Sequence, residues 1–312
     1  MPSKKVDWAA YDKSLKQRGS ITFWMSDEAA EAWYAEPTGK RGAQPKFSEL
    51  AIETALSLRL VFGHALRQTE GLIESIFEMM NLDLCVPDHS TLSRRGEVID
   101  ISSKVTRNPD EELVVIIDST GLKIFGAGEW NETKHGLSKR REWRKLHLSI
   151  NESSLEIVVY SLTDNHVGDP TEALNHLTKI EDPIDELMGD GAYDTKAIYS
   201  SVESCNDDGD HSVTIPPRAG AVVSTAFPDD PSQRDDHVNF VDAHGKKAWE
   251  KSIGYYRRLL VENAIGRYKG IIGATLLARN FEGQKNEAAL ACNILNKMVR
   301  LGTPLRPAII PS

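Results

Sequence analysis

Long apolar runs are absent from this sequence. Nowhere in its 312 residues do about eighteen apolar residues follow one another, the length that a membrane-spanning helix needs. The segment from Met1 to Trp8 contains Lys4 and Lys5 but lacks the apolar core of a secretory signal. These two absences predict a cytoplasmic protein that has no membrane partner.

Cysteine is also scarce. Its three occurrences, Cys85, Cys205 and Cys292, lie far apart, are odd in number and lack the spacing of metal ligands. This pattern argues against a disulfide framework and is typical of thiols in a reducing compartment. With 40% hydrophobic and 27% charged residues, the chain has the composition of a globular protein with a buried core of its own.

Positive charge is in deficit overall, but it is unevenly distributed. The net charge of −9 argues on its own against a nucleic-acid partner. Basic residues nevertheless cluster between Lys134 and His147, where Glu142 is the one acid, and again from Tyr255 onward. Such polarity favours one side that faces phosphate and one that faces solvent. The open alternative is a surface of scattered salt bridges.

The first third of the chain is predicted to be helical. After a Gly/Pro-rich linker, the spacing of apolar residues predicts three helices, at 48–62, 66–80 and 90–98. Ser48 and Asp88 are the candidate N-caps of the first and third helices. The three helices fit a helix-turn-helix in which Arg94 and Arg95 reach DNA, and they fit an ordinary helical scaffold almost as well.

From residue 112 the pattern changes to strands alternating with helices. The predicted strands are 113–117, 121–125, 145–150, 155–160, 184–188 and 212–215, and the predicted helices are 169–177, 195–205, 251–269 and 284–301. An Asp-rich, turn-prone stretch at about 219–247 is expected to be an exposed insertion. Three antiparallel strands followed by alternating helices and strands predict an α/β fold with a mixed sheet and flanking helices.

Two predicted strands end in aspartate, at Asp118 and at Asp190, where ligands of an open α/β sheet gather. Glu262 lies on a predicted helix with apolar neighbours, which we expect to be largely buried. Its face also carries Tyr255, Arg258 and Lys269 at helical spacing. Three carboxylates suit Mg²⁺ or Mn²⁺, and the cations beside Glu262 suit phosphate.

Each of these acids also has a structural interpretation. Asp118 could cap a turn, Asp190 could serve its glycine-flanked turn, and Glu262 could pair with Arg258. Asp194 is expected to cap the next helix and not to bind metal. Core packing is favoured over base stacking for the tryptophans Trp130, Trp143 and Trp249.

The ordered set of motifs resembles the DDE transposases, specifically the bacterial insertion-sequence-five family, along nearly the whole chain. The matching segments are Trp8–Trp24, Leu66–Thr69, Val86–Arg95, Asp118–Lys123, Trp143–Leu148 and Gly189–Asp194, and the set Tyr255, Arg258, Glu262 and Lys269. The resemblance implies a ribonuclease-H-like domain, with Asp118, Asp190 and Glu262 as the catalytic residues that hold two Mg²⁺ or Mn²⁺ ions. The net negative charge is unusual for this family.

On this resemblance, residues 1–108 form a helical DNA-binding region, 109–303 the catalytic domain and 304–312 a tail. Double-stranded DNA is the expected partner, as terminal inverted repeats and as target, bound by a homodimer at the nucleoid. The expected DNA contacts are Arg94, Arg95, Lys139, Arg140, Arg141, Arg144, Lys145, Tyr255, Arg258 and Lys269. Two alternatives stay open: a ribonuclease-H-like nuclease without strand transfer, and a transposase-derived DNA-binding regulator without catalysis.

Overall fold

The computed structural model describes residues 8–37, 39, 41–101, 111–125, 142–205, 211–224 and 232–302. The chain divides into two compact units, one formed by residues 1–101 with 293–312 and the other by residues 102–292. The domain boundary expected after residue 108 lies outside the described residues. Within the described ranges, no helix has both the length and the apolar character that crossing a membrane requires.

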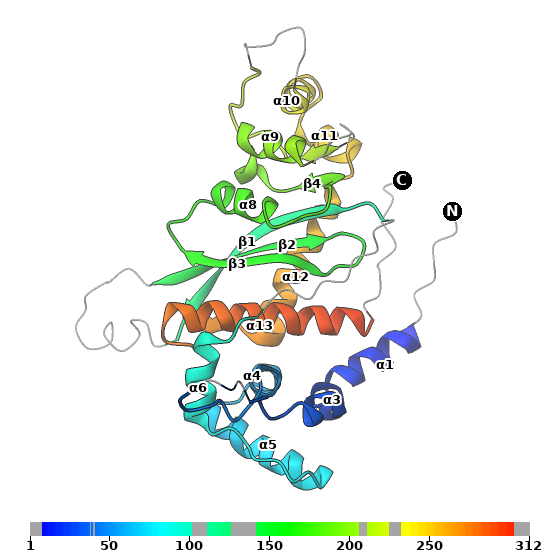
Figure 1. Cartoon of the computed structure of the whole chain (residues 1–312). Helices are drawn as coiled ribbons and strands as arrows, with labels where there is room; N and C mark the ends of the chain where they lie inside the picture. Colours follow the sequence, from blue (N-terminus) through cyan, green and yellow to red (C-terminus); the bar gives the residue numbers. More distant parts are fainter. Residues whose placement is uncertain are drawn as a thin grey trace, which may run out of the picture. The chain divides into compact units, whose positions relative to one another are not determined.

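The first unit is helical (Figure 1). Its helices are α1 (Trp8–Arg18), α2 (Ile21–Trp24), α3 (Asp27–Glu31), α4 (Glu49–Phe62), α5 (Leu66–Met80) and α6 (His89–Val98), and the end of α13 (Phe281–Arg300) joins them. Ser48 caps α4 by accepting from the amide of Ala51, and Asp88 caps α6 by accepting from Ser90 and Thr91. The three helices expected in this region are therefore confirmed, with Leu92 of α6 fully buried.

The second unit is built on a mixed sheet, as the sequence predicts. Its strands are β1 (Val114–Ile124), β2 (Trp143–Asn151), β3 (Ile157–Asp164), β4 (Glu186–Met188), β5 (Ser212–Thr214) and β6 (Thr275–Leu276). They run in the order β3-β2-β1-β4-β5, and β6 also pairs with β1. The β1, β2 and β3 pairings are antiparallel, whereas β4 and β6 run parallel to β1 and β5 runs parallel to β4.

Strand β1 is longer than the sequence suggested. We expected one strand to end at Asp118 and a neighbouring strand to begin at Gly121, but both stretches belong to β1. Its pairing with β2 is unbroken from Val115 to Lys123, so the polar residues between the two apolar stretches form no turn. Asp118 consequently lies within a strand, just beyond the point where pairing with β4 stops.

Helices cover both faces of this sheet (Figure 1). On one face, α8 (Asp169–Leu177) and α9 (Lys196–Ser204) pack on a core that includes Val115, Ile117 and Leu187. On the other face, α12 (Leu259–Arg267) contacts β1 and β2. Since side chains alternate along a strand, Asp118 points toward α12 and its neighbour Ser119 points toward α8.

Two expectations about the later segments are wrong. Part of the stretch expected to be turn-prone forms helix α10 (Gln233–His244), which Ser232 caps, followed by α11 (Lys246–Ser252). The helix expected at 251–269 is interrupted because Gly254 has a φ of 66°. It is replaced by the 3₁₀ turn η2 (Tyr255–Arg258), then α12, then the π-helical turn η3 (Tyr268–Ile272).

Candidate active site

Asp118 is a mostly buried carboxylate in the middle of β1, with 17% of its side chain exposed. Its Oδ2 lies 3.0 Å from Nη1 of Arg258, and its Oδ1 accepts a hydrogen bond from the amide of Ser119. Burial raises the pKa of Asp118, and nearby Asp190 and Glu262 raise it further, although Ser119 and Arg258 oppose the shift. The three predicted acids therefore interact across this end of the sheet.

Asp190 follows β4 and begins the 3₁₀ turn η1 (Gly191–Tyr193), where its Oδ1 accepts from the amide of Ala192 at 2.8 Å. The turn role considered for this residue is therefore present. Gly189 allows the close packing here, because an added Cβ would lie 3.0 Å from the ring of Tyr193. The hydroxyl of Tyr255 donates to the carbonyl of Gly189 at 3.2 Å, so Asp190 is held beside the η2 turn.

Glu262 is more exposed than we expected, with 43% of its side chain accessible. The prediction of a largely buried helix is wrong, because Leu259 is 55% exposed and the side chains of α12 that are buried are those of Val261 and Ala264. Nη2 of Arg258 contacts Oε1 of Glu262, so the structural pairing left open in the sequence does form. One guanidinium thus binds Asp118 and Glu262 at the same time.

The four signature residues do not share one regular helix. Tyr255 and Arg258 lie on η2, Glu262 on α12 and Lys269 on the π-helical turn η3. The guanidinium of Arg258 lies 6.0 Å from the ring centroid of Tyr255. Burial raises the pKa of the Tyr255 hydroxyl to about 12, so this hydroxyl stays protonated at neutral pH.

Two family models, each described as a transposase DDE domain, match this chain, one over residues 16–127 and the other over residues 109–297. The second match covers more than half of the chain and includes all three acids. The chain belongs to the DDE transposases.

Two solved structures are also similar to this transposase, both at 11% sequence identity. One is described as a Mos1 transposase paired-end complex with left transposon end. The match covers 76% of this chain and 81% of the Mos1 chain, with a TM-score of 0.22. The other, the crystal structure of a pre-cleavage Mos1 transpososome, covers 87% of this chain and 84% of its own, also with a TM-score of 0.22. Likenesses this distant do not bear on the fold.

DDE transposases use divalent metal ions, and the donor set of this one fits such a cation. Carboxylate oxygens are hard donors of the kind that Mg²⁺ and Mn²⁺ prefer. Burial first, and then Asp190 and Glu262, raise the pKa of Asp118, so a bound cation would stabilise its charged form. Among the described residues no three His, Cys, Asp or Glu side chains are arranged as a metal site. Arg258 contacts one carboxylate oxygen of Asp118 and one of Glu262.

A fourth carboxylate lies on the opposite face of β1, at Asp169. Its Oδ1 accepts from Ser119 Oγ at 2.8 Å and lies 3.2 Å from Lys145 Nζ and 3.6 Å from His147 Nδ1. From the sequence we expected Asp169 only to start a helix. The pairing was not visible there because it joins segments that are far apart in the chain.

The loop that carries Asp190 is braced by side chains that we did not predict. Arg218 Nε donates to the carbonyl of Gly191 at 2.9 Å, and the Arg218 amide donates to Asp194 Oδ2. Arg234 forms an ion pair with the same Asp194 at 2.6 Å. Asp194 therefore binds two arginines inside the protein. The prediction that it caps α9 is wrong, since Thr195 occupies the N-cap position and makes no capping side-chain bond.

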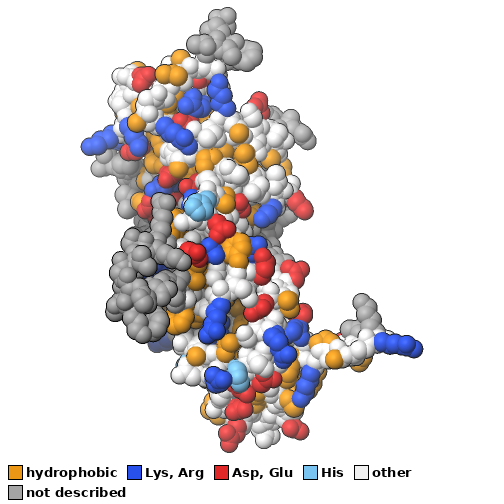
Figure 2. Space-filling view, turned by 90° about the vertical axis from the view of Figure 1, so that its left-hand side faces the viewer, with side chains coloured by type: hydrophobic (Ala, Val, Ile, Leu, Met, Phe, Trp, Pro, Cys, Tyr) orange, Lys and Arg blue, Asp and Glu red, His pale blue; other side chains and the backbone are white. Residues whose placement is uncertain are grey.

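Of the basic residues expected to contact DNA between Lys139 and Lys145, the two that the structure describes are bound to other side chains of the protein. Lys139, Arg140 and Arg141 lie outside the described residues. Arg144 is 16% exposed and pairs with Asp164 and Gln284, and Lys145 is 14% exposed and pairs with Asp169. On the face shown in Figure 2, Lys and Arg side chains of the described segments are scattered among Asp and Glu.

In the helical unit, Arg94 and Arg95 also differ. Arg95 is 19% exposed, contacts Glu49 and donates to the carbonyl of Phe47 at 3.1 Å, so it joins α6 to the start of α4. Arg94 is exposed, and among the described residues its side chain hydrogen-bonds to the carbonyl of Ser90 in its own helix. Of the two, Arg94 is the side chain available to a ligand.

Proposed function

We propose that this DDE transposase cuts and joins DNA at the terminal inverted repeats of an insertion sequence of the insertion-sequence-five family. The observation that carries the proposal is the proximity of Asp118, Asp190 and Glu262 around the central strand β1. A single guanidinium joins Asp118 to Glu262, and Asp190 is close enough to raise the pKa of Asp118. The strand order β3-β2-β1-β4-β5 supports a ribonuclease-H-like assignment of this sheet.

In the proposed mechanism, Asp118, Asp190 and Glu262 supply the oxygen ligands of two Mg²⁺ ions, with Mn²⁺ as a substitute. The bound ions would activate the attacking water or 3′-hydroxyl and stabilise the leaving oxygen. Glu262 lies on the exposed side of α12 and can turn away from Arg258 toward the two aspartates. Arg258, released from Glu262, and Lys269 then neutralise phosphate charge beside the scissile bond. Tyr255, fixed to Gly189, keeps the η2 turn beside Asp190.

For the helical unit, we propose that α4, α5 and α6 form a helix-turn-helix in which α6 reads the inverted repeat. Arg94→Ala should reduce the discrimination between true ends and random DNA by about 1–3 kcal/mol, since an arginine paired to a base edge supplies that much. Arg95→Ala should instead lower the melting temperature, because Arg95 joins two helices of the unit. Equal weakening of Arg94→Ala on both DNAs would leave Arg94 as a phosphate contact without sequence discrimination.

The basic stretch from Lys139 to Lys145 is proposed to contact DNA phosphates next to the site, in a homodimer assembled on DNA. Each phosphate contact that is lost should reduce the salt dependence of binding by about one counterion. Arg140→Ala with Arg141→Ala therefore tests this stretch without disturbing the internal pairs of Arg144 and Lys145. An unchanged affinity and salt slope would contradict the proposal.

The experiment that tests the main proposal is a plasmid assay with DNA that carries the element's ends. The protein, incubated with Mg²⁺, should nick or cut at the ends and produce joined products. Cut products without joined ones would favour a nuclease that lacks strand transfer. Binding to the ends without any cutting would favour a DNA-binding regulator and would contradict the proposed function.

A further inference from the structure

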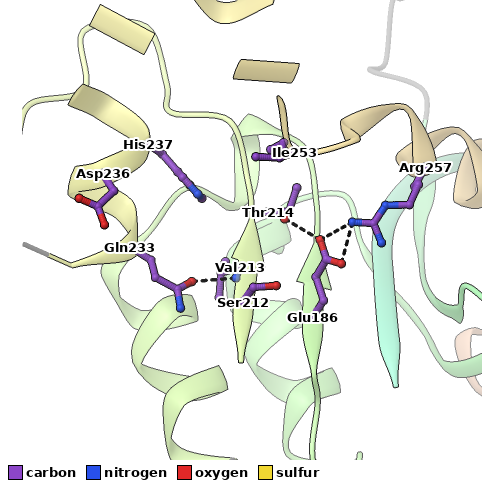
Figure 3. A pocket seen from close by; sticks show the side chains of 9 residues that line it. All are labelled: Glu186, Ser212, Val213, Thr214, Gln233, Asp236, His237, Ile253 and Arg257. Atoms are coloured by element: carbon purple, nitrogen blue, oxygen red, sulfur yellow. Dashed lines mark hydrogen bonds and ion pairs between the residues drawn. The ribbon is translucent and has the colours of Figure 1, made fainter. Parts of the chain in front are cut away.

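Arg257 stands next to Arg258 on the η2 turn, but its side chain is bound to different acids. Its Nη2 donates to both carboxylate oxygens of Glu186 at 2.7 Å, and its Nη1 donates to Glu152 at 3.0 Å. Figure 3 shows the fork between Arg257 and Glu186 at one side of a cavity of about 390 Å³. Arg257 is 24% exposed and Glu186 is 13% exposed, so water screens this pair only in part.

The partners of Arg257 are themselves fixed to the sheet. Glu186 is the first residue of β4, and its Oε1 also accepts from Thr214 Oγ1 of β5 at 2.6 Å. Glu152 lies in the turn between β2 and β3, and its amide donates to the carbonyl of Val114 at the start of β1. Through these bonds, Arg257 attaches the η2 turn to the mixed sheet.

The local hydrogen bonds of the η2 turn hold it only weakly, so its bonds to the sheet through Arg257 matter for its position. It is a short 3₁₀ segment, whose hydrogen bonds are poorer than those of an α-helix, and it follows Gly254 in the left-handed conformation. Arg258, at the end of the turn, reaches Asp118 and Glu262, and Tyr255, at its start, reaches the carbonyl before Asp190. A shift of the turn would therefore move the groups that bind Asp118, Glu262 and the carbonyl of Gly189, the residue before Asp190.

We propose that Arg257, held by Glu186 and Glu152, is a positioning residue for the catalytic centre: it sets where Arg258 and Glu262 stand relative to Asp118 and Asp190. The inference rests on the proposed function, because it assigns these acids to metal binding. Arg257 lies outside the Tyr-Arg-Glu-Lys signature, so the resemblance to the family did not mark it. It would act through Arg258 and Glu262 without touching DNA.

The test uses the full chain and compares Glu186→Gln with Glu152→Gln. Each substitution keeps the size of the side chain and weakens the bonds of Arg257 to one of its two partners. Cleavage at saturating DNA and the Mg²⁺ concentration for half-maximal cleavage are measured well below each melting temperature. For Glu186→Gln we expect the cleavage rate to fall, or the Mg²⁺ concentration for half-maximal cleavage to rise, by about 10- to 100-fold, as for other groups that orient metal ligands. Glu152→Gln, which weakens the single hydrogen bond from Nη1 of Arg257, should show a smaller change in the same direction.

Two further variants separate positioning from stability. Thr214→Val removes one bond to Glu186 and is the milder substitution if Glu186→Gln folds poorly; it should still raise the Mg²⁺ requirement. Glu282→Gln breaks the exposed pair with Lys285 on α13 and is the control, with unchanged kinetics expected. If Glu186→Gln and Thr214→Val lower only the melting temperature and leave both kinetic quantities at wild-type values, the inference is overturned. A wild-type chain that cuts no DNA would overturn the proposed function and the inference with it.

Discussion

The two faces of the mixed sheet carry polar groups in very different states. On the face toward α12, Asp118 and Glu262 share the guanidinium of Arg258 with part of their surface exposed, and Asp118 has a pKa raised by burial. On the face toward α8, His176 has no exposed surface and binds Ser149 through Nδ1 and Ser161 through Nε2, both at 2.8 Å. Burial lowers the pKa of His176 to about 3, so the imidazole is neutral.

The difference agrees with the proposed function, in which the acidic cluster does chemistry and the buried one stabilises the fold. A buried network whose members are matched by hydroxyl partners specifies packing. A partly exposed cluster of acids with net negative charge costs stability and is the kind of site that a bound cation completes. The two faces of the sheet are therefore expected to serve two purposes, and substitutions on the two faces should separate them.

The largest effect is expected on the acidic face. Asp118→Asn should abolish DNA cleavage because it removes a charged metal ligand. Without divalent ions, its free energy of unfolding at pH 7 should equal or exceed that of the wild type, since a raised pKa means that the fold disfavours the charge. Mg²⁺ should raise the melting temperature of the wild type more than that of the variant. Chemical denaturation beside a plasmid assay checks this, and retained cleavage would contradict it.

On the other face the effect should be on stability. His176→Phe leaves the hydroxyls of Ser149 and Ser161 without their imidazole partner and should cost about 1–3 kcal/mol of unfolding free energy. Cleavage per folded molecule should stay at the wild-type level. The same substitution at the exposed His166 is the matched control and should cost little. Loss of cleavage in a folded His176→Phe protein would remove the distinction between the faces.

A smaller effect is expected from pH. The folded pKa of His176 lies below its unfolded value of about 6.5, so the unfolded chain binds more protons between pH 6.5 and about 3. Stability is therefore complete above pH 6.5 and falls as the pH is lowered, by about 1.4 kcal/mol per unit for this group. Burial lowers the pKa of His147 in the same direction. The unfolding free energy is measured by urea titration at several pH values from 7.5 to 5. Its decrease with falling pH should be smaller for His176→Gln than for the wild type, and an identical decrease would show that His176 is not held neutral.

Local patterns in the sequence predicted most helices and strands. The helix from Leu66 to Met80 was predicted at its observed bounds, because an apolar face and a following break are both local signals. Strand β1 was divided wrongly, because Ser119, Thr120 and Gly121 have turn chemistry and only their pairing with β2 keeps them extended. Such pairing joins distant parts of the chain, so no local pattern reveals it.

The site shows the same limit. The residues Asp118, Asp190 and Glu262 were identified through motifs and family resemblance, but the environment of each came from the fold. Glu186 and Glu152 lie 71 and 105 residues from Arg257 in the chain, so their pairing could not be predicted from spacing. The one signal in the sequence was Arg257 itself, directly before Arg258. A second arginine next to the signature arginine suggests an acidic partner of its own.

The most direct test of the central claim is Glu262→Gln, which keeps the size and most of the packing of the residue but removes its charge. Melting temperature, binding to end DNA and cleavage with Mg²⁺ are measured on a single preparation. The account predicts a folded variant that binds ends nearly as well as the wild type and neither nicks nor joins them. If Glu262 only pairs with Arg258, the cost should be about 0.2–0.5 kcal/mol of stability with cleavage intact. Full cleavage by this variant would contradict the assignment of Glu262 as a catalytic metal ligand.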